Sequence, residues 1–129
     1  MNKIEESVQA FNEGYCCSQA ILSIYGESLN LNQELALKMS IPFCGGMGIK
    51  SVCGALTGAL MVIGIKEGVP LKGSENRVNV KSLVIKYIEK FKEEYGTIIC
   101  EELLKIEDGS TLCPKIVRSS AKILESLIY

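Results

Sequence analysis

The feature that most constrains the fold is an almost purely apolar run from Cys53 to Ile65, CGALTGALMVIGI. A helix needs about 18 apolar residues to cross a bilayer, and this run is too short. We therefore expect a buried helix at the centre of the protein. Gly54 and Gly58, like Ala55 and Ala59, recur at i, i+4 spacing. Small side chains at that spacing let a neighbouring helix pack very close to the central one.

The remaining apolar residues recur mostly at helical rather than alternating spacing. At 129 residues and 14.1 kDa, the chain is expected to form one domain over residues 1–129. The predicted fold class is all-α, a compact bundle of about five or six helices around the central apolar helix.

Several residues predict where helices begin and end. Asn32 is placed to cap a helix over QELALKMSI, and Pro42 is placed to end it. The clearest amphipathic pattern runs from Ser74 to Tyr95. Thr97 is expected to start a short helix over TIICEELLKI, and Pro114 to occupy the first position of the last helix.

Composition excludes several classes of function. Fourteen basic and fifteen acidic residues leave a net charge of −1, which gives no electrostatic reason to expect nucleic acid or a membrane as partner. The chain contains no histidine. This absence excludes histidine-dependent triads, imidazole metal ligands and haem held by histidine. The lack of a C-x-x-C-H motif also excludes haem c.

Six cysteines are the residues most able to carry chemistry: Cys16, Cys17, Cys44, Cys53, Cys100 and Cys113. The start MNKIEESVQAF does not resemble a secretory signal, so we expect a cytoplasmic protein. In that compartment structural disulfides are uncommon, and clustered thiols more often indicate metal or redox chemistry.

The glycine-rich segment FCGGMGIKSVCG matches neither a Walker motif nor a dinucleotide-binding fingerprint, so no nucleotide is expected. We interpret it as a tight turn beside the site, with these residues near any cofactor: Cys44, Gly45, Gly46, Gly48 and Gly54. Cys53 follows this turn at the expected start of the central helix, where free amides stabilise an anion. Cys53 is therefore predicted to be the most acidic thiol.

Cys100 and Cys113 are also expected near helix starts. Cys16 and Cys17 are adjacent, and their side chains diverge by about 100° on a helix. We therefore expect Cys16 to point away from the partners of Cys17, with a strained Cys16–Cys17 disulfide as an alternative. Cys44 is expected to border the site.

This ordered set of motifs resembles the C_GCAxxG_C_C family of small cysteine-rich proteins, described as redox-active, over nearly the whole chain. GYCCSQAIL is similar to the family segment whose cysteine corresponds to Cys17. PFCGGMGIKSVCGALTGALMVIGI carries the central CGAxxG motif, which begins at Cys53. FKEEYGTIICEELL and CPKIVRSSAKILESL resemble the segments with the third and fourth cysteines, Cys100 and Cys113. Cys16 and Cys44 fall outside this four-cysteine pattern.

Two classes of function fit these residues. The first is a redox or electron-transfer protein whose four family-matching cysteines converge on one site. They would act as thiolate ligands of an iron–sulfur cluster or another metal such as zinc, or as dithiol–disulfide pairs. The alternative is a non-catalytic carrier of a metal or sulfur species. A redox function implies a partner protein, and the close-packing glycines and the apolar tail LESLIY also allow a homodimer.

Overall fold

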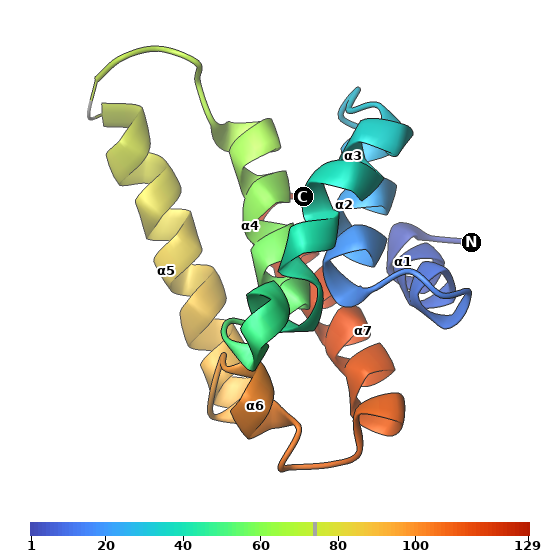
Figure 1. Ribbon diagram of the computed structural model, residues 1–129. Helices are drawn as coiled ribbons and strands as arrows, with labels where there is room; N and C mark the ends of the chain where they lie inside the picture. The colour runs from blue at the N-terminus through green and yellow to red at the C-terminus, as the bar shows by residue number, and fades with distance from the viewer. Residues whose placement is uncertain (74) are drawn as a thin grey trace.

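The computed structural model describes residues 1–73 and 75–129, and these residues contain seven α-helices (Figure 1). The helices are α1 (Lys3–Asn12), α2 (Cys17–Glu27), α3 (Gln33–Ser40), α4 (Gly54–Glu67), α5 (Glu75–Tyr95), α6 (Cys100–Leu103) and α7 (Gly109–Ile128). The predicted all-α class is confirmed. The described residues contain one or two more helices than the five or six expected.

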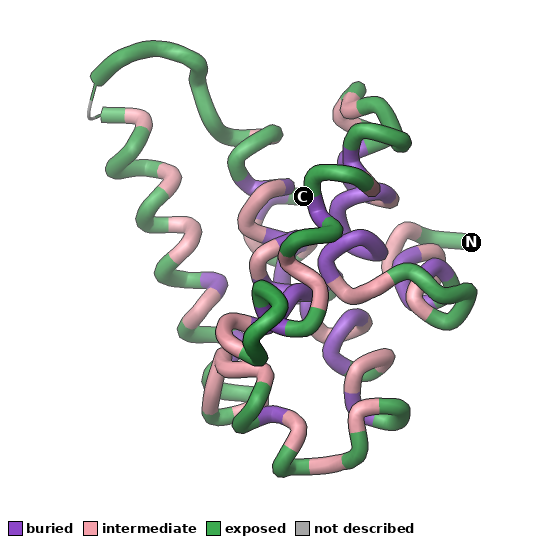
Figure 2. The backbone as a smooth tube through the Cα atoms, viewed as in Figure 1, coloured by how far each residue is buried: buried purple, intermediate pink, exposed green. Residues whose placement is uncertain are grey.

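The apolar helix α4 lies at the centre of the fold, as the sequence predicts. It packs against α2, α5 and α7, and Figure 1 shows it between α5 on one side and α2 on the other. Seven of its 14 residues are buried, including Leu56, Val62 and Ile63, and Figure 2 shows buried segments along this helix. The first half of α5 is largely exposed by comparison. Helix α4 is therefore the element on which the other helices assemble.

The contact between α2 and α4 is unusually close because α4 presents glycine to α2. A Cβ atom at Gly58 would lie 2.9 Å from the carbonyl oxygen of Ser18, and one at Gly54 would lie 3.0 Å from that of Phe43. Neither site has room for a side chain. The predicted close packing at Gly54 and Gly58 is confirmed, and it holds the start of α2 directly over the start of α4.

A buried set of hydrogen bonds joins α4, α5 and α7. Ser120 Oγ donates to the carbonyl oxygen of Ala55 at 2.9 Å, and the Tyr87 hydroxyl also hydrogen-bonds Ser120 Oγ. All three residues are fully buried. Because buried polar groups are costly without partners, these bonds favour one relative position of the three helices.

The local sequence correctly predicts the cap and the end of α3 and the presence of α5. Asn32 Oδ1 accepts a hydrogen bond from the Leu35 amide at 2.9 Å, so the predicted cap of α3 is confirmed. Helix α3 ends at Ser40, and Pro42 lies in the short 3₁₀ turn that follows. The predicted amphipathic helix is α5, although its expected first residue, Ser74, lies outside the described residues.

Two predicted helix starts are wrong. Residues 97–99 are not helical, and α6 begins only at Cys100, because the backbone there pairs with residues 51–53. Helix α7 begins at Gly109, five residues before Pro114, with Asp108 accepting a hydrogen bond from the Ser110 amide. Pro114 has no amide proton to donate to the carbonyl oxygen of Ser110. The helix accommodates Pro114 because Ser110 is exposed and lies in the first turn of α7.

The described residues form no strand, and their only β-type pairing is an isolated antiparallel bridge between Val52 and Ile99. Among the helices of residues 1–73 and 75–129, none combines the length and apolar character needed to cross a membrane.

The glycine contact makes a direct prediction about stability. Gly58→Ala should lower the free energy of unfolding by about 2 kcal/mol, because the new methyl group overlaps the backbone of α2. Gly64→Ala, on an open part of the same helix, should instead raise it by about 0.5–1 kcal/mol. Chemical denaturation followed by circular dichroism measures both. Equal effects of the two substitutions would contradict close packing at Gly58.

Candidate functional site

Four cysteines from four different segments line one cavity of about 240 Å³. Cys17 is the first residue of α2, Cys53 immediately precedes α4, Cys100 is the first residue of α6, and Cys113 lies one turn into α7. None of the four is in a disulfide. Much of the remaining wall is apolar, formed by Phe11, Leu103, Leu104 and Ile116. The structure thus brings together cysteines that span most of the sequence.

Backbone pairing brings Cys53 and Cys100 to the cavity. The Cys53 amide donates to the carbonyl oxygen of Ile98 at 2.8 Å, and the Cys100 amide donates to that of Ser51 at 2.6 Å. These two bonds flank the bridge between Val52 and Ile99. A tertiary backbone contact, rather than a local motif, therefore sets the relative position of two of the four thiols.

The glycine-rich turn forms another part of the wall. Gly45, Gly46, Met47 and Gly48 have φ between 61° and 76°, so the chain makes a left-handed turn that favours glycine. A Cβ atom at Gly46 would lie 2.8 Å from Cβ of Cys100. Gly46 therefore satisfies two demands, a left-handed backbone and close contact with a cysteine of the site.

The residues predicted to lie near a cofactor fall into two groups. Gly45, Gly46 and Gly54 line the cavity, whereas Cys44 and Gly48 are not among its lining residues. Cys44 is instead joined to Cys16.

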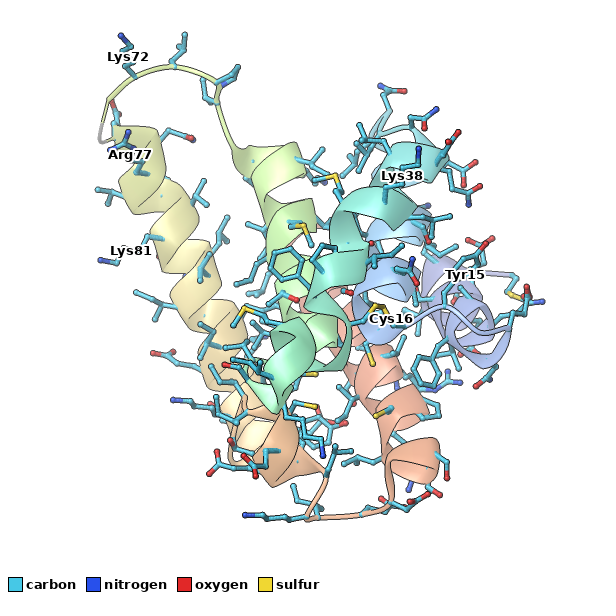
Figure 3. The ribbon with its side chains drawn as sticks, in the orientation of Figure 1. Tyr15, Cys16, Lys38, Lys72, Arg77 and Lys81 are labelled. Atoms are coloured by element: carbon cyan, nitrogen blue, oxygen red, sulfur yellow. A yellow bond between two sulfur atoms is a disulfide. The ribbon has the colours of Figure 1, made fainter. Side chains whose placement is uncertain are left out.

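The disulfide between Cys16 and Cys44 corrects the prediction for both residues. Their Cα atoms are 5.6 Å apart, within the usual range for a disulfide. Cys16, which is labelled beside the first turn of α2 in Figure 3, also lines the same cavity as Cys17, so it does not point away from the site as expected. The sequence could not reveal this pair, because it depends on the approach of the start of α2 to the turn after α3.

Two polar residues beside this disulfide, Gln19 and Ser18, were not predicted from the sequence to belong to the site. Gln19 Oε1 accepts a hydrogen bond from the Cys16 amide at 3.2 Å, and its amide nitrogen donates to the carbonyl oxygen of Leu37. Ser18 Oγ lies 3.3 Å from Cys16 Sγ. A glutamine three residues after a helix cap is a known capping signal, and it could have indicated the first of these contacts.

Cys17 and Cys113 line the same cavity and affect each other's ionisation. Interaction with the Cys17 side chain lowers the pKa of Cys113 to about 7, although burial opposes this shift. The same interaction, with burial, raises the pKa of Cys17 well above its ordinary value. In this pair Cys17 keeps its proton and Cys113 is the residue that ionises.

Cys53 is not the most acidic thiol, contrary to the sequence prediction. It does lie at the start of α4, and the amides of Ala55 and Leu56 favour its thiolate. However, Cys53 is buried, and loss of solvation raises its pKa to about 11 despite these amides. Proximity to a helix start thus does not decide the acidity of this residue.

The other thiols differ from the sequence expectation in smaller ways. Burial raises the pKa of Cys100, and the nearby Cys113 charge adds to this shift while Lys50 opposes it. Cys113 was expected at a helix start but lies inside α7.

The cavity offers thiolate donors, which suit zinc and iron–sulfur clusters. Among the cysteine, aspartate and glutamate side chains of residues 1–73 and 75–129, no group of three or more is arranged to hold a metal ion. The four thiols share a cavity without forming a preassembled ligand set for one ion.

The fold and the site define a small helical protein with a cysteine-lined cavity. The family model described as "Putative redox-active protein (C_GCAxxG_C_C)" matches residues 15–127 of the chain. The chain belongs to this family, as its ordered motifs indicated. No curated protein and no solved structure matches the chain.

The different acidities of the cavity thiols predict how the reactivity of each depends on pH. In fully reduced protein, the alkylation rate of Cys113 should rise with a midpoint near pH 7, whereas Cys53 should titrate near pH 11. Cys17→Ala removes the donor and should raise the pKa of Cys113, and Cys17→Ser should retain part of the shift. Alkylation quantified residue by residue with mass spectrometry measures each value. An unchanged Cys113 in Cys17→Ala would disprove the thiol–thiolate pair.

Proposed function

We propose that this protein is a thiol redox protein in which Cys17 and Cys113 form a reversible dithiol–disulfide couple. The observation that carries the proposal is that both residues are free thiols lining one largely apolar cavity. Membership of a family described as redox-active supports the same class of function. Thiols that line one small cavity can be joined by a disulfide when their Cα atoms come within about 7 Å.

The protonation states favour a defined order of reaction with a disulfide of a partner molecule. The Cys113 thiolate attacks one sulfur of that disulfide, and the other sulfur leaves as a thiolate. Cys17 then loses its proton to solvent and attacks Cys113 Sγ, which forms the Cys17–Cys113 disulfide and releases the second partner thiolate. The partner gains two electrons, and the Cys17–Cys113 couple loses two.

The environment of Cys17 suits this second role. Its pKa is raised chiefly by the interaction with Cys113. Once Cys113 is bound in a mixed disulfide, it carries no charge, and this contribution disappears. Cys17 therefore becomes easier to deprotonate at the stage when it must attack.

Oxidation of the reduced protein tests the proposal. One equivalent of diamide should link Cys17 to Cys113, because both are free thiols of one cavity and Cys113 ionises readily. Peptide mapping after acid quenching identifies the linked cysteines. Cys113→Ser should abolish the product, and Cys100→Ser, a matched change in the same cavity, should leave it unchanged. Failure of the wild-type protein to form this disulfide at any oxidant concentration would refute the proposal.

A second candidate function is favoured by the presence of all four family cysteines around one cavity. They would hold an iron–sulfur cluster, which is wider than a single ion and accepts more widely spaced thiolates. The cluster would supply one-electron redox chemistry, or the protein would carry a metal or sulfur species without turnover. In this function Cys53 and Cys100 would be ligands.

Cys100→Ser separates the two candidates. If the cluster is correct, anaerobically purified protein should be brown and contain iron and sulfide, and Cys100→Ser should lose at least half of both. If the dithiol couple alone operates, the wild type should be colourless and the variant should oxidise normally. Iron and sulfide assays, a visible spectrum and a free-thiol count measure these outcomes.

A further inference from the structure

One cysteine of the disulfide shares the cavity with the free thiols. Cys16 is joined to Cys44, and Cys16 lines the same cavity as Cys17 and Cys113. Cys16 and Cys17 are also consecutive residues, so their Cα atoms are about 3.8 Å apart. Thiol–disulfide exchange requires that a thiolate can reach one sulfur of a disulfide. The shared cavity gives Cys16 this access to Cys17 and Cys113.

The surroundings of the Cys16–Cys44 disulfide also suit its reduced form. Ser18 Oγ is fully buried and lies 3.3 Å from Cys16 Sγ and 3.9 Å from Cys44 Sγ. Its hydroxyl proton is donated to the carbonyl oxygen of Ser40 at 2.8 Å. A hydroxyl has one proton, so its oxygen faces the two sulfurs as an acceptor.

This acceptor distinguishes the two oxidation states of the pair. A disulfide has no S–H group, so it donates nothing to Ser18 Oγ. A reduced Cys16 thiol at the same position donates a hydrogen bond to that buried oxygen. The site thus stabilises a dithiol, which a disulfide serving only to link two segments does not require.

We propose that Cys16 and Cys44 form a second redox couple that returns electrons to the Cys17–Cys113 couple inside the same chain. The inference rests on the proposed dithiol function and adds the source of its electrons. In a reducing compartment such as the cytoplasm, disulfides are more often transient and catalytic than structural.

The exchange balances without any further reagent. The Cys16 thiolate attacks Cys113 Sγ of the Cys17–Cys113 disulfide, and Cys17 leaves and takes up a proton. The Cys44 thiolate then attacks Cys16 Sγ, which forms the Cys16–Cys44 disulfide and releases Cys113 as a thiolate. Two electrons pass from Cys16 and Cys44 to Cys17 and Cys113, and the protons of the attacking thiols pass to Cys17 and solvent. The products are the oxidation states that the structure shows.

Time-resolved disulfide mapping tests the transfer. Fully reduced wild-type protein receives one equivalent of diamide and is quenched with acid at increasing times. The Cys17–Cys113 disulfide should appear first and then convert to Cys16–Cys44. The conversion rate should not change over a tenfold range of protein concentration, because the transfer is intramolecular. Ser82→Ala, on the exposed face of α5 and outside the cavity, should behave like the wild type.

Any of three results would overturn the inference. The Cys17–Cys113 disulfide could persist without converting, or the conversion rate could rise with protein concentration. The Cys16–Cys44 disulfide could also form without a preceding Cys17–Cys113 disulfide. The double variant Cys16→Ser/Cys44→Ser keeps the two proposals apart. If it still forms Cys17–Cys113, the proposed function stands although the transfer fails. If neither it nor the wild type forms that disulfide, the proposed function itself fails.

Ser18→Ala provides a readout that a merely structural role would not change. The bond from Ser18 to Ser40 is lost in both oxidation states and cancels, whereas the bond from the Cys16 thiol is lost only in the reduced state. The final ratio of Cys16–Cys44 to Cys17–Cys113 disulfide should therefore rise about fivefold, the change expected for one hydrogen bond. An unchanged ratio would contradict the acceptor role of Ser18.

Discussion

The close contact of α2 with the glycine face of α4 is the constraint on which the rest of the structure depends. Gly58 allows the backbone of Ser18 to approach closer than any side chain would permit. This approach sets the position of the first turn of α2, and with it the sulfurs of Cys16 and Cys17. The positions of Cys16 and Cys17 are therefore a consequence of helix packing, and a small shift of α2 would move both sulfurs relative to the rest of the cavity.

The parts of the fold that could be predicted are those that local sequence determines. The apolar run of α4 and the periodic pattern of α5 reveal their helices, and Asn32 reveals a cap. The starts of α6 and α7 could not be predicted in the same way. In place of helical hydrogen bonds, residues 98–100 form backbone hydrogen bonds with residues 51–53, which are distant in sequence. The residue types near position 98 do not indicate such a long-range pairing.

The same division applies to the candidate site. Its four family cysteines could be identified from ordered motifs, and the structure places them around one cavity. The Cys16–Cys44 pair could not be identified, because disulfide pairing depends on distance in the folded chain and not on spacing. Ser18 is a comparable case. In the sequence it resembles any other serine of a helix. Its contact with the disulfide depends on the positions of Ser40 and of the Cys16 sulfur in the folded chain.

Acidity shows most clearly why position along a helix is insufficient to rank the thiols. Cys53 has the amides of a helix start, yet burial outweighs them and keeps it protonated. Cys113 lies one turn inside α7, and interaction with the Cys17 side chain is enough to lower its pKa. Interaction with a neighbouring thiol therefore outweighs burial at Cys113, whereas the amides at the start of α4 do not outweigh burial at Cys53. That asymmetry gives one member of the pair the charge and the other the proton, which is the division of roles that dithiol chemistry requires.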